Sequence, residues 1–311
     1  MIGETASLTA AVLWATASII FTRLGRDDVS PLAMNLLKCV IATALLVLTL
    51  LYLDGRLWPY ELALTETGIL AASGVIGLTI GDTAYFGALT RIGPRRSLLL
   101  WALSPPITAV LALPVLGEPI TIKMVAGMVL TIGGVVWVIL ERNPSGSGDA
   151  IRVDQKDDGF TKAELVGIAF GVGAATCQAT GNVLAKLGGA EIAALDLSIV
   201  RLAFGIVGLG IVVGATSRIG ETLRPMKVPK KAGLIFVATF LGTYLGIWLL
   251  MTGIQNTYTG IAATLSSTSP IWILPLAYFF EDETITLRAV AGAVIAVFGI
   301  AVLFVNPSHL F

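Results

Sequence analysis

Long apolar runs, separated by short polar connections, make up most of this chain. A helix needs about 20 apolar residues to cross the ~30 Å hydrocarbon core of a bilayer. Runs of about this length lie at residues 5–24, 31–53, 67–89, 97–116, 121–140, 163–186, 195–215, 232–254, 260–280 and 286–305. Most connections between them contain turn residues, such as Gly93 and Pro94. The pattern therefore predicts an all-α polytopic membrane protein with ten transmembrane helices.

One connection is longer and more polar than the others. Residues 143–161 begin with glycine and serine and then mix acidic and basic residues, which is typical of a solvated linker. Five predicted helices fall on each side of it. The sequence thus predicts a first five-helix repeat over 1–142, a polar linker over 143–161 and a second five-helix repeat over 162–311.

The two halves also match each other in sequence. Identical residues recur 165 positions apart, and the matching pairs include Pro105/Pro270, Glu118/Glu283, Gly127/Gly292 and Gly134/Gly299. Upstream, an offset of 163 positions aligns Lys38 with Arg201. So many matches in register indicate an internal duplication. Because five is an odd number, the second copy enters the membrane opposite to the first, and the repeat is predicted to be inverted.

Basic residues favour one face of the predicted membrane in both halves. They follow the first, third, seventh and ninth helices and occupy the linker, at Arg23, Arg26, Arg91, Arg95, Arg96, Arg142, Arg152, Lys156, Lys162, Arg218, Arg224, Lys227, Lys230, Lys231 and Arg288. The opposite face has Arg56, Lys123 and Lys186. By the positive-inside rule the basic face is cytoplasmic, which predicts that both termini lie outside.

The composition agrees with a chain that is surrounded mostly by lipid. Hydrophobic residues make up 56% of it and charged residues 13%, whereas soluble domains carry about 25% charged residues. The predicted partners are therefore the lipid bilayer and a small-molecule substrate, and the predicted location is the cell membrane. A net charge of zero argues against nucleic acid as a partner.

The sequence offers little for catalysis or for a bound cofactor. Its single histidine, His309, lies close to the C-terminus, which removes nearly every histidine-based catalytic or metal scheme. No Walker-type phosphate-binding sequence is present, so ATP is not expected to drive the protein directly. We expect no enzymatic activity, no cofactor and no metal, with protons as the candidate coupling ion.

Two ordered blocks resemble a known family. The first runs through Gly81-Asp82-Thr83-Ala84-Tyr85-Phe86-Gly87-Ala88-Leu89, Ser104-Pro105 and Leu116-Gly117-Glu118-Pro119-Ile120-Thr121. The second runs from Ser269-Pro270 to Glu281-Asp282-Glu283-Thr284-Ile285-Thr286. Together with Trp14 and the helix-two cations Lys38 and Arg201, these blocks resemble the EamA family of the drug/metabolite transporter superfamily.

The resemblance covers essentially the whole chain and implies a ten-helix inverted repeat. It implies a substrate cavity between the halves, lined mainly by the first four helices of each, with the fifth and tenth helices as peripheral scaffolding. Two departures stand out. Lys38 replaces a more usual arginine, and the family arrangement has both termini inside, opposite to the orientation that the charge bias predicts. The sequence leaves both orientations open.

Three ionisable residues inside predicted helices are candidates for the substrate-binding site. Burying such a group in hydrocarbon costs about 2.5–3.5 kcal/mol or more, so it is usually paired or functional. Lys38 and Asp82 lie at a matching depth, ~10 Å below the same face at 1.5 Å per residue. They are predicted to form an ion pair, which Tyr85, one turn from Asp82, is placed to join. The alternative is a structural pair that only holds the second and third helices together.

Arg201 is the third ionisable candidate. It is the repeat partner of Lys38, but Ile247 stands where the acid equivalent to Asp82 would be. A buried guanidinium with no fixed partner presents a fork of donors to a carboxylate, sulfonate or phosphate. The alternative is that Arg201 extends to the nearby interface, or bonds to Asp196, Ser198 or backbone carbonyls.

Other candidates are individually weaker. Trp14, Trp101 and Trp248 can form an aromatic pocket, although anchoring near the interface explains some of them equally well. Further polar candidates are Asn35, Gln178, Asn182 and Tyr244. Pro105, Pro106, Pro270 and Pro275 lie inside predicted spans and are expected to kink them.

These features favour a secondary transporter that exports a small polar or amphipathic metabolite, such as an amino acid or organic anion, by alternating access coupled to protons. One alternative is a flippase for a lipid or polyprenyl phosphate, which would use Arg201 and a lateral opening. Another is an intramembrane enzyme that acts on lipid-linked phosphates. The scattered acids and the single terminal histidine argue against the enzyme.

Overall fold

The computed structural model describes residues 2–59, 63–117, 119–140, 161–189, 192–256, 265–281 and 285–304. Apart from Thr161, the predicted linker 143–161 lies outside these ranges, as do Glu118, Glu283 and His309. Within the described ranges, every regular element is a helix. Six helical segments among the described residues are long and apolar enough to cross a membrane, and three shorter apolar helices accompany them at Ser104–Leu116, Ser269–Phe280 and Leu287–Val302. This agrees with the all-α polytopic membrane protein that the hydrophobic pattern predicted.

The first half holds α1 to α6. Their bounds are α1 Ile2–Arg26, α2 Pro31–Asp54, α3 Leu64–Gly74, η1 Val75–Asp82, α4 Thr83–Trp101, α5 Ser104–Leu116 and α6 Ile122–Ile139. Local sequence sets several of these ends. The Ser30 hydroxyl accepts a hydrogen bond from the Ala33 amide at the start of α2, and Gly55 ends that helix with a left-handed φ of 67°.

The second half holds α7 to α14. Their bounds are α7 Lys162–Gly189, α8 Ala194–Ala215, α9 Ile219–Leu223, η2 Arg224–Lys227, α10 Pro229–Thr239, η3 Phe240–Leu245, α11 Gly246–Asn256, α13 Ser269–Glu281 and α14 Leu287–Phe304. A capping box begins α7, because the Glu164 amide donates to the Thr161 hydroxyl at 3.2 Å and the Thr161 amide donates to Glu164 Oε2 at 3.0 Å.

The third and fourth spans are longer in the structure than the hydrophobic pattern predicted. The third was predicted to end at residue 89, but helix continues to a break at Gly93, whose φ of 76° and ψ of 172° are not helical. The fourth span therefore begins at Pro94 rather than at residue 97. It is interrupted again at residues 102–103, after which Pro105 lies in the first turn of α5. This proline starts a helix, where its missing N–H costs nothing.

The third helix of each half packs against the first two helices of the other half. The α3–η1 segment contacts α7 and α8, and the α10–η3–α11 segment contacts α1 and α2. Hydrogen bonds join the α3–η1 segment to α7 and α8. Ser73 Oγ donates to the Gly181 carbonyl at 2.6 Å, and Thr79 Oγ1 donates to the Gly205 carbonyl at 3.0 Å. Since each half supplies a helix to the other, the two halves are interlocked.

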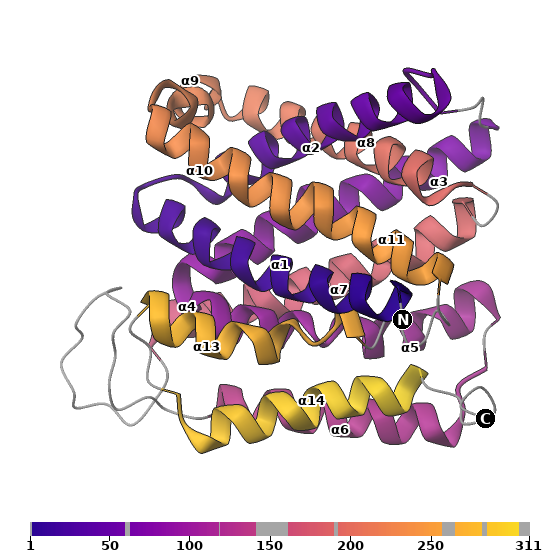
Figure 1. Ribbon diagram of the computed structural model, residues 1–311, viewed down its shortest axis with the longest axis vertical. Coiled ribbons are helices and arrows are strands. Elements are labelled where there is room, and N and C mark those ends of the chain that lie inside the picture. Colours follow the sequence, from indigo (N-terminus) through magenta and orange to yellow (C-terminus); the bar gives the residue numbers. More distant parts are fainter. Residues whose placement is uncertain are drawn as a thin grey trace.

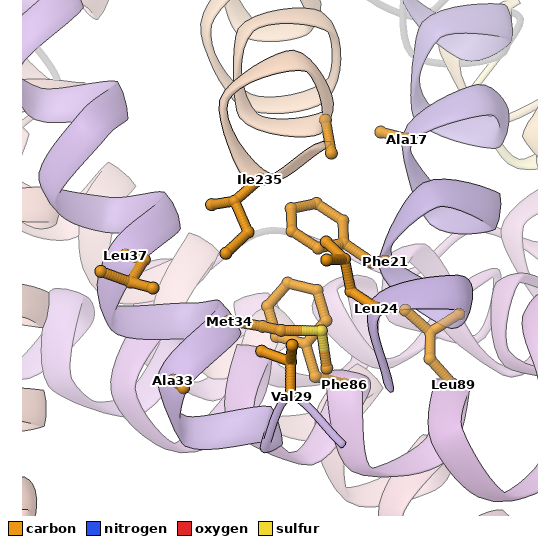
Figure 2. Packing of buried hydrophobic residues seen from close by; sticks show 11 residues of the cluster. Ala17, Phe21, Leu24, Val29, Ala33, Met34, Leu37, Phe86, Leu89 and Ile235 are labelled. Carbon is orange, nitrogen blue, oxygen red and sulfur yellow. The ribbon is translucent and has the colours of Figure 1, made fainter. Parts of the chain in front are cut away.

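Apolar side chains pack around the contacts between the two halves. Figure 2 shows one buried cluster in which Phe21 and Leu24 of α1 meet Met34 of α2, Phe86 of α4 and Ile235 of α10. The Phe21 and Phe86 rings pack edge to face with centroids 4.7 Å apart. This cluster therefore joins four helices from both halves.

The fifth helices of the two halves, α6 and α14, form a pair at one side of the molecule, at the bottom of Figure 1. Repeat-related glycines let their backbones touch. A Cβ atom on Gly134 would lie 2.6 Å from the Gly292 carbonyl oxygen, and one on Gly299 would lie 2.7 Å from that of Gly127. Between these contacts Thr131 Oγ1 donates to the Ala296 carbonyl at 3.3 Å. Small residues of this kind allow close helix contact in lipid.

Candidate substrate-binding site

A cavity of about 470 Å³ lies between the two halves. Its described lining comes from α1, α2, η1, α4, α5, α7, α8, η3, α11 and α13, together with the residues just before α13. The helices α6 and α14 contribute none of these lining residues. The cavity is thus built by the first four helices of each half, the arrangement that the family resemblance implies.

Two π-helical segments, η1 and η3, border the cavity at equivalent positions. They begin at Val75 and Phe240, which are repeat partners. Leu78 and Asp82 line the cavity from η1, and Gly242 and Thr243 line it from η3. Single π turns inside α-helices are rare and are frequent at functional sites. Their presence in both halves marks this part of the third helices as a repeated, site-forming feature.

Side chains from the neighbouring helices hold both π segments. The Asn35 amide Nδ2 donates to the Leu78 carbonyl at 2.7 Å and to Thr83 Oγ1 at 2.9 Å. On the other side, Trp14 Nε1 donates to the Gly242 carbonyl at 2.7 Å. These bonds satisfy buried backbone carbonyls inside irregular helix. Asn35 and Trp14 therefore fix the shape of the cavity wall.

Lys38 and Asp82 form an ion pair, as their matching depths predicted. Both side chains are about nine-tenths buried and line the cavity. The Lys38 ammonium also lies 5.4 Å from the centroid of the Phe86 ring, at cation–π distance. Tyr85 lines the cavity beside them, where its ring packs edge to face on Trp101 with centroids 4.9 Å apart. No hydrogen bond joins Tyr85 to Asp82 in the part of the chain that the structure describes.

Arg201 lines the same cavity, and among the described residues no ion pair joins it to Asp82, the acid of that lining. Its Nε and Nη2 atoms are buried and have no hydrogen-bond partner among the described residues. Asp196 instead lies 3.5 Å from Arg56, and the Ser198 hydroxyl donates to the Ala194 carbonyl at 2.7 Å. Ile247, the repeat equivalent of Asp82, lines the cavity as an apolar residue. The two side-chain partners that the sequence left open for Arg201 are thus engaged elsewhere.

Gln178 and Asn182 reach the cavity from α7, one turn apart. Gln178 Nε2 donates to Asn182 Oδ1 at 3.4 Å, whereas Gln178 Oε1 is buried with no hydrogen-bond partner among the described residues. Together with Trp14, Lys38, Asp82, Tyr85, Trp101 and Arg201, these residues bring eight of the eleven candidates to one cavity.

The other three candidates, Asn35, Tyr244 and Trp248, are outside the cavity lining. Asn35 is fully buried and engaged with η1. The Tyr244 hydroxyl lies 2.9 Å from Thr49 Oγ1 of α2, and the Trp248 side chain is exposed on the outer surface of the protein. Depth along a helix was known from the sequence, but the direction of each side chain around the helix axis was not.

The sequence reading missed the hydroxyl groups and the π segments. Ser18 and Thr243 line the cavity although neither belongs to a motif, and Ser104 and Ser198 line it although neither was predicted as a site residue. The π segments did leave a signal. Gly77 and Gly242, like Gly81 and Gly246, are repeat partners 165 positions apart, so both segments could have been found from paired glycines at equal spacing.

The interlocked helices, the apolar spans and the cavity define an integral membrane transporter with an inverted repeat. The model of the EamA-like transporter family matches residues 1–140 and 165–305. The chain therefore belongs to the EamA-like transporter family.

Relatives agree with this class. A protein of Archaeoglobus fulgidus named "uncharacterized transporter" is 26% identical over 304 residues, covering 97% of this chain and 97% of that protein. One of Clostridium kluyveri with the same name is 22% identical over 295 residues, covering 94% of this chain and 89% of that protein. A solved crystal structure matches 96% of this chain and 95% of its own with a TM-score of 0.66 at 16% identity, which shows a shared fold.

Proposed function

We propose that this transporter moves a small polar or amphipathic metabolite with an anionic group, such as an amino acid or an organic anion, by alternating access. Arg201 carries the proposal. Its Nε and Nη2 atoms are buried and unpartnered among the described residues, and the side chain lines the cavity. A planar guanidinium binds carboxylate or phosphate through two parallel hydrogen bonds, and a substrate that supplies them satisfies both atoms at once.

The remaining lining supports a substrate that is partly apolar. Trp14, Phe21, Tyr85, Phe86 and Trp101 all contribute to the cavity wall. Cavities of this size with mostly apolar walls and a few placed polar groups are typical of small-molecule sites. Arg201 orients one end of the substrate in this proposal, and the aromatic side chains contact the other.

We further propose outward transport across the cell membrane with protons as the coupling ion. Asp82 is the acidic side chain among the described residues of the lining, and it is paired with Lys38. Acids within transmembrane segments commonly mark ion or proton pathways. In this proposal Asp82 takes up a proton when the pair with Lys38 opens, which links the proton gradient to the shape of the cavity.

Solute uptake into proteoliposomes tests the transporter proposal. The purified protein is reconstituted and offered a panel of amino acids, organic acids and organic cations, with and without a pH gradient. We expect transport of carboxylate-bearing compounds, faster with the gradient than after an ionophore has collapsed it. Transport restricted to organic cations would contradict an anion-binding role for Arg201.

Substitution of Arg201 provides the residue-level prediction. Arg201→Lys keeps the charge but loses the bidentate geometry, so transport of an anionic substrate should fall about tenfold or more while folding is retained. Arg201→Gln removes the charge and should nearly abolish transport. The thermal stability of each variant in detergent is measured in parallel. Wild-type transport with an unchanged half-saturation concentration in folded Arg201→Gln protein would show that Arg201 is structural.

A further inference from the structure

Two unsatisfied polar atoms, Arg201 Nη2 and Gln178 Oε1, both lie close to Gly77 of η1. A Cβ atom built on Gly77 would lie 3.3 Å from Arg201 Nη2 and 3.6 Å from Gln178 Oε1. Both atoms are buried and lack a hydrogen-bond partner among the described residues, and both side chains line the cavity. One is a donor and the other an acceptor, and leaving such groups unpaired is costly. A ligand that satisfies both must therefore carry an acceptor and a donor close together.

The contact with Asn182 fixes which atom of the Gln178 amide faces the guanidinium. Gln178 Nε2 donates to Asn182 Oδ1 at 3.4 Å, which turns Oε1 toward Arg201. This orientation is favourable because the negative end of the amide dipole faces the cation. The opposite orientation would bring two sets of N–H donors together. Gln178 thus offers an acceptor beside the donors of Arg201.

The geometry of Arg201 points to a carboxylate as the acceptor. Nε and Nη2 lie on one edge of the guanidinium, and a carboxylate can bind that edge through both oxygens. The donor for Gln178 must then be close to the carboxylate, which a substituent on the adjacent carbon provides. A simple carboxylate would leave Gln178 Oε1 unpaired.

The charges of the cavity decide whether that donor is neutral or positive. Lys38, Asp82 and Arg201 are the charged side chains among the described lining residues. Since Lys38 and Asp82 balance each other, Arg201 leaves one positive charge in excess. A monoanion neutralises this charge. An ammonium group at Gln178 would instead sit beside the guanidinium, where two like charges repel.

Resting on the proposed function, we infer that the substrate is a monoanionic carboxylate with a neutral hydrogen-bond donor on the adjacent carbon, and that Gln178 determines this specificity. A 2-hydroxy acid or an N-acylated amino acid has this chemistry. A free amino acid has the donor with an unfavourable charge, and an unsubstituted acid lacks the donor.

Three compounds with one carbon skeleton separate these possibilities. 3-Phenyllactate, phenylalanine and 3-phenylpropionate carry a hydroxyl, an ammonium and a hydrogen at the same carbon, and their ring suits an aromatic lining that includes Trp14, Tyr85 and Trp101. Isothermal titration calorimetry on the purified full-length protein gives the affinity for each. We expect 3-phenyllactate to bind about tenfold more tightly than either of the others, since the missing hydrogen bond and the repelled charge each weaken binding.

Gln178→Leu removes the acceptor at similar size. This variant should bind 3-phenyllactate no more tightly than 3-phenylpropionate, whose own affinity should not change. Thr176→Val is the matched control, because Thr176 lies on the same helix, is exposed, and its hydroxyl bonds only to the Val172 carbonyl among the described residues. The control should keep the wild-type preference.

Each contrary outcome removes a defined part of the inference. The inference about Gln178 would be wrong if the wild type bound the three compounds with equal affinity. It would also be wrong if Gln178→Leu kept the preference for the hydroxyl compound, since Gln178 would then not bind the donor. Tighter binding of phenylalanine would overturn the neutral donor, and no binding of 3-phenyllactate would overturn the substrate class. Where the wild type binds any of the three carboxylates, loss of that binding in Arg201→Gln would leave the proposed function standing. Unchanged binding in Arg201→Gln would overturn the proposed function as well.

Discussion

Two cations that are repeat partners, Lys38 and Arg201, have different surroundings at the scale of single residues. Lys38 is paired with Asp82. Arg201 faces a cavity in which the equivalent position is Ile247, and two of its nitrogens are unpartnered among the described residues. A buried pair is costly to break, whereas a buried unpaired donor can be satisfied by a ligand. In the proposed function this asymmetry leaves Arg201 available to substrate, whereas the charge of Lys38 is balanced by Asp82 within the protein.

The Lys38–Asp82 pair should behave as a coupled unit. Lys38→Met leaves Asp82 buried without its partner, which should destabilise the protein by about 3–5 kcal/mol. Adding Asp82→Asn removes the uncompensated charge and should recover part of the loss. The thermal unfolding midpoint in detergent is measured for both single variants and the double variant. Strictly additive losses would contradict the coupling.

The sequence predicted this pair because depth along a helix follows from residue counting. It could not predict the positions of Tyr244 and Trp248, whose depths are suitable but whose side chains point to Thr49 and to the outer surface. Direction around the helix axis depends on packing between helices, and a π turn changes it by inserting a residue. Tyr244 lies inside such a turn, η3. This is why the candidate site was predicted only in part.

At the scale of helices, hydrophobic length predicted the spans well but not their interruptions. At the break between the third and fourth spans, Gly93 has a positive φ that only glycine adopts easily. The chain can therefore change direction at this one residue, and the two spans are joined with no loop between them. The π segments are likewise invisible to hydropathy, because they alter the hydrogen-bond ladder and leave the apolar character unchanged. Repeated glycines at equal spacing, Gly77/Gly242 and Gly81/Gly246, are the residual sequence signal.

The α6–α14 crossing supplies the prediction at this scale. A methyl group on Gly134 would clash with the Gly292 carbonyl 2.6 Å away, whereas a methyl group on the neighbouring Gly133 would meet no atom within 4 Å. Gly134→Ala should therefore destabilise the protein by about 1–3 kcal/mol, as overpacking does. Gly133→Ala is the matched control and should be neutral or slightly stabilising, because alanine favours helix. Equal unfolding midpoints for the two variants would show that the crossing is not tightly packed.

At the scale of the whole molecule, basic residues from distant connections meet on one face. Arg96 of α4 pairs with Glu164 of α7 at 2.9 Å, and Lys231 of α10 donates to the Asp27 carbonyl after α1. Arg23 lies over the ring of Phe280 at the end of α13. These contacts bring the ends of the first, third and ninth spans together with the starts of the sixth and eighth, as an inverted repeat requires. Among the described residues, Arg23, Arg96 and Lys231 thus contribute to one basic surface.

That surface leads to a prediction about orientation. Because positively charged connections are retained in the cytoplasm, the basic face should be cytoplasmic and both termini should lie outside. Alkaline phosphatase fused after Phe311 should be active in cells, and green fluorescent protein fused there should be dark. The same reporters inserted after Ser147, in the predicted linker, should give the reverse pattern. A fluorescent C-terminal fusion with an inactive phosphatase would invert the orientation, and it would leave the inverted repeat and the cavity unchanged.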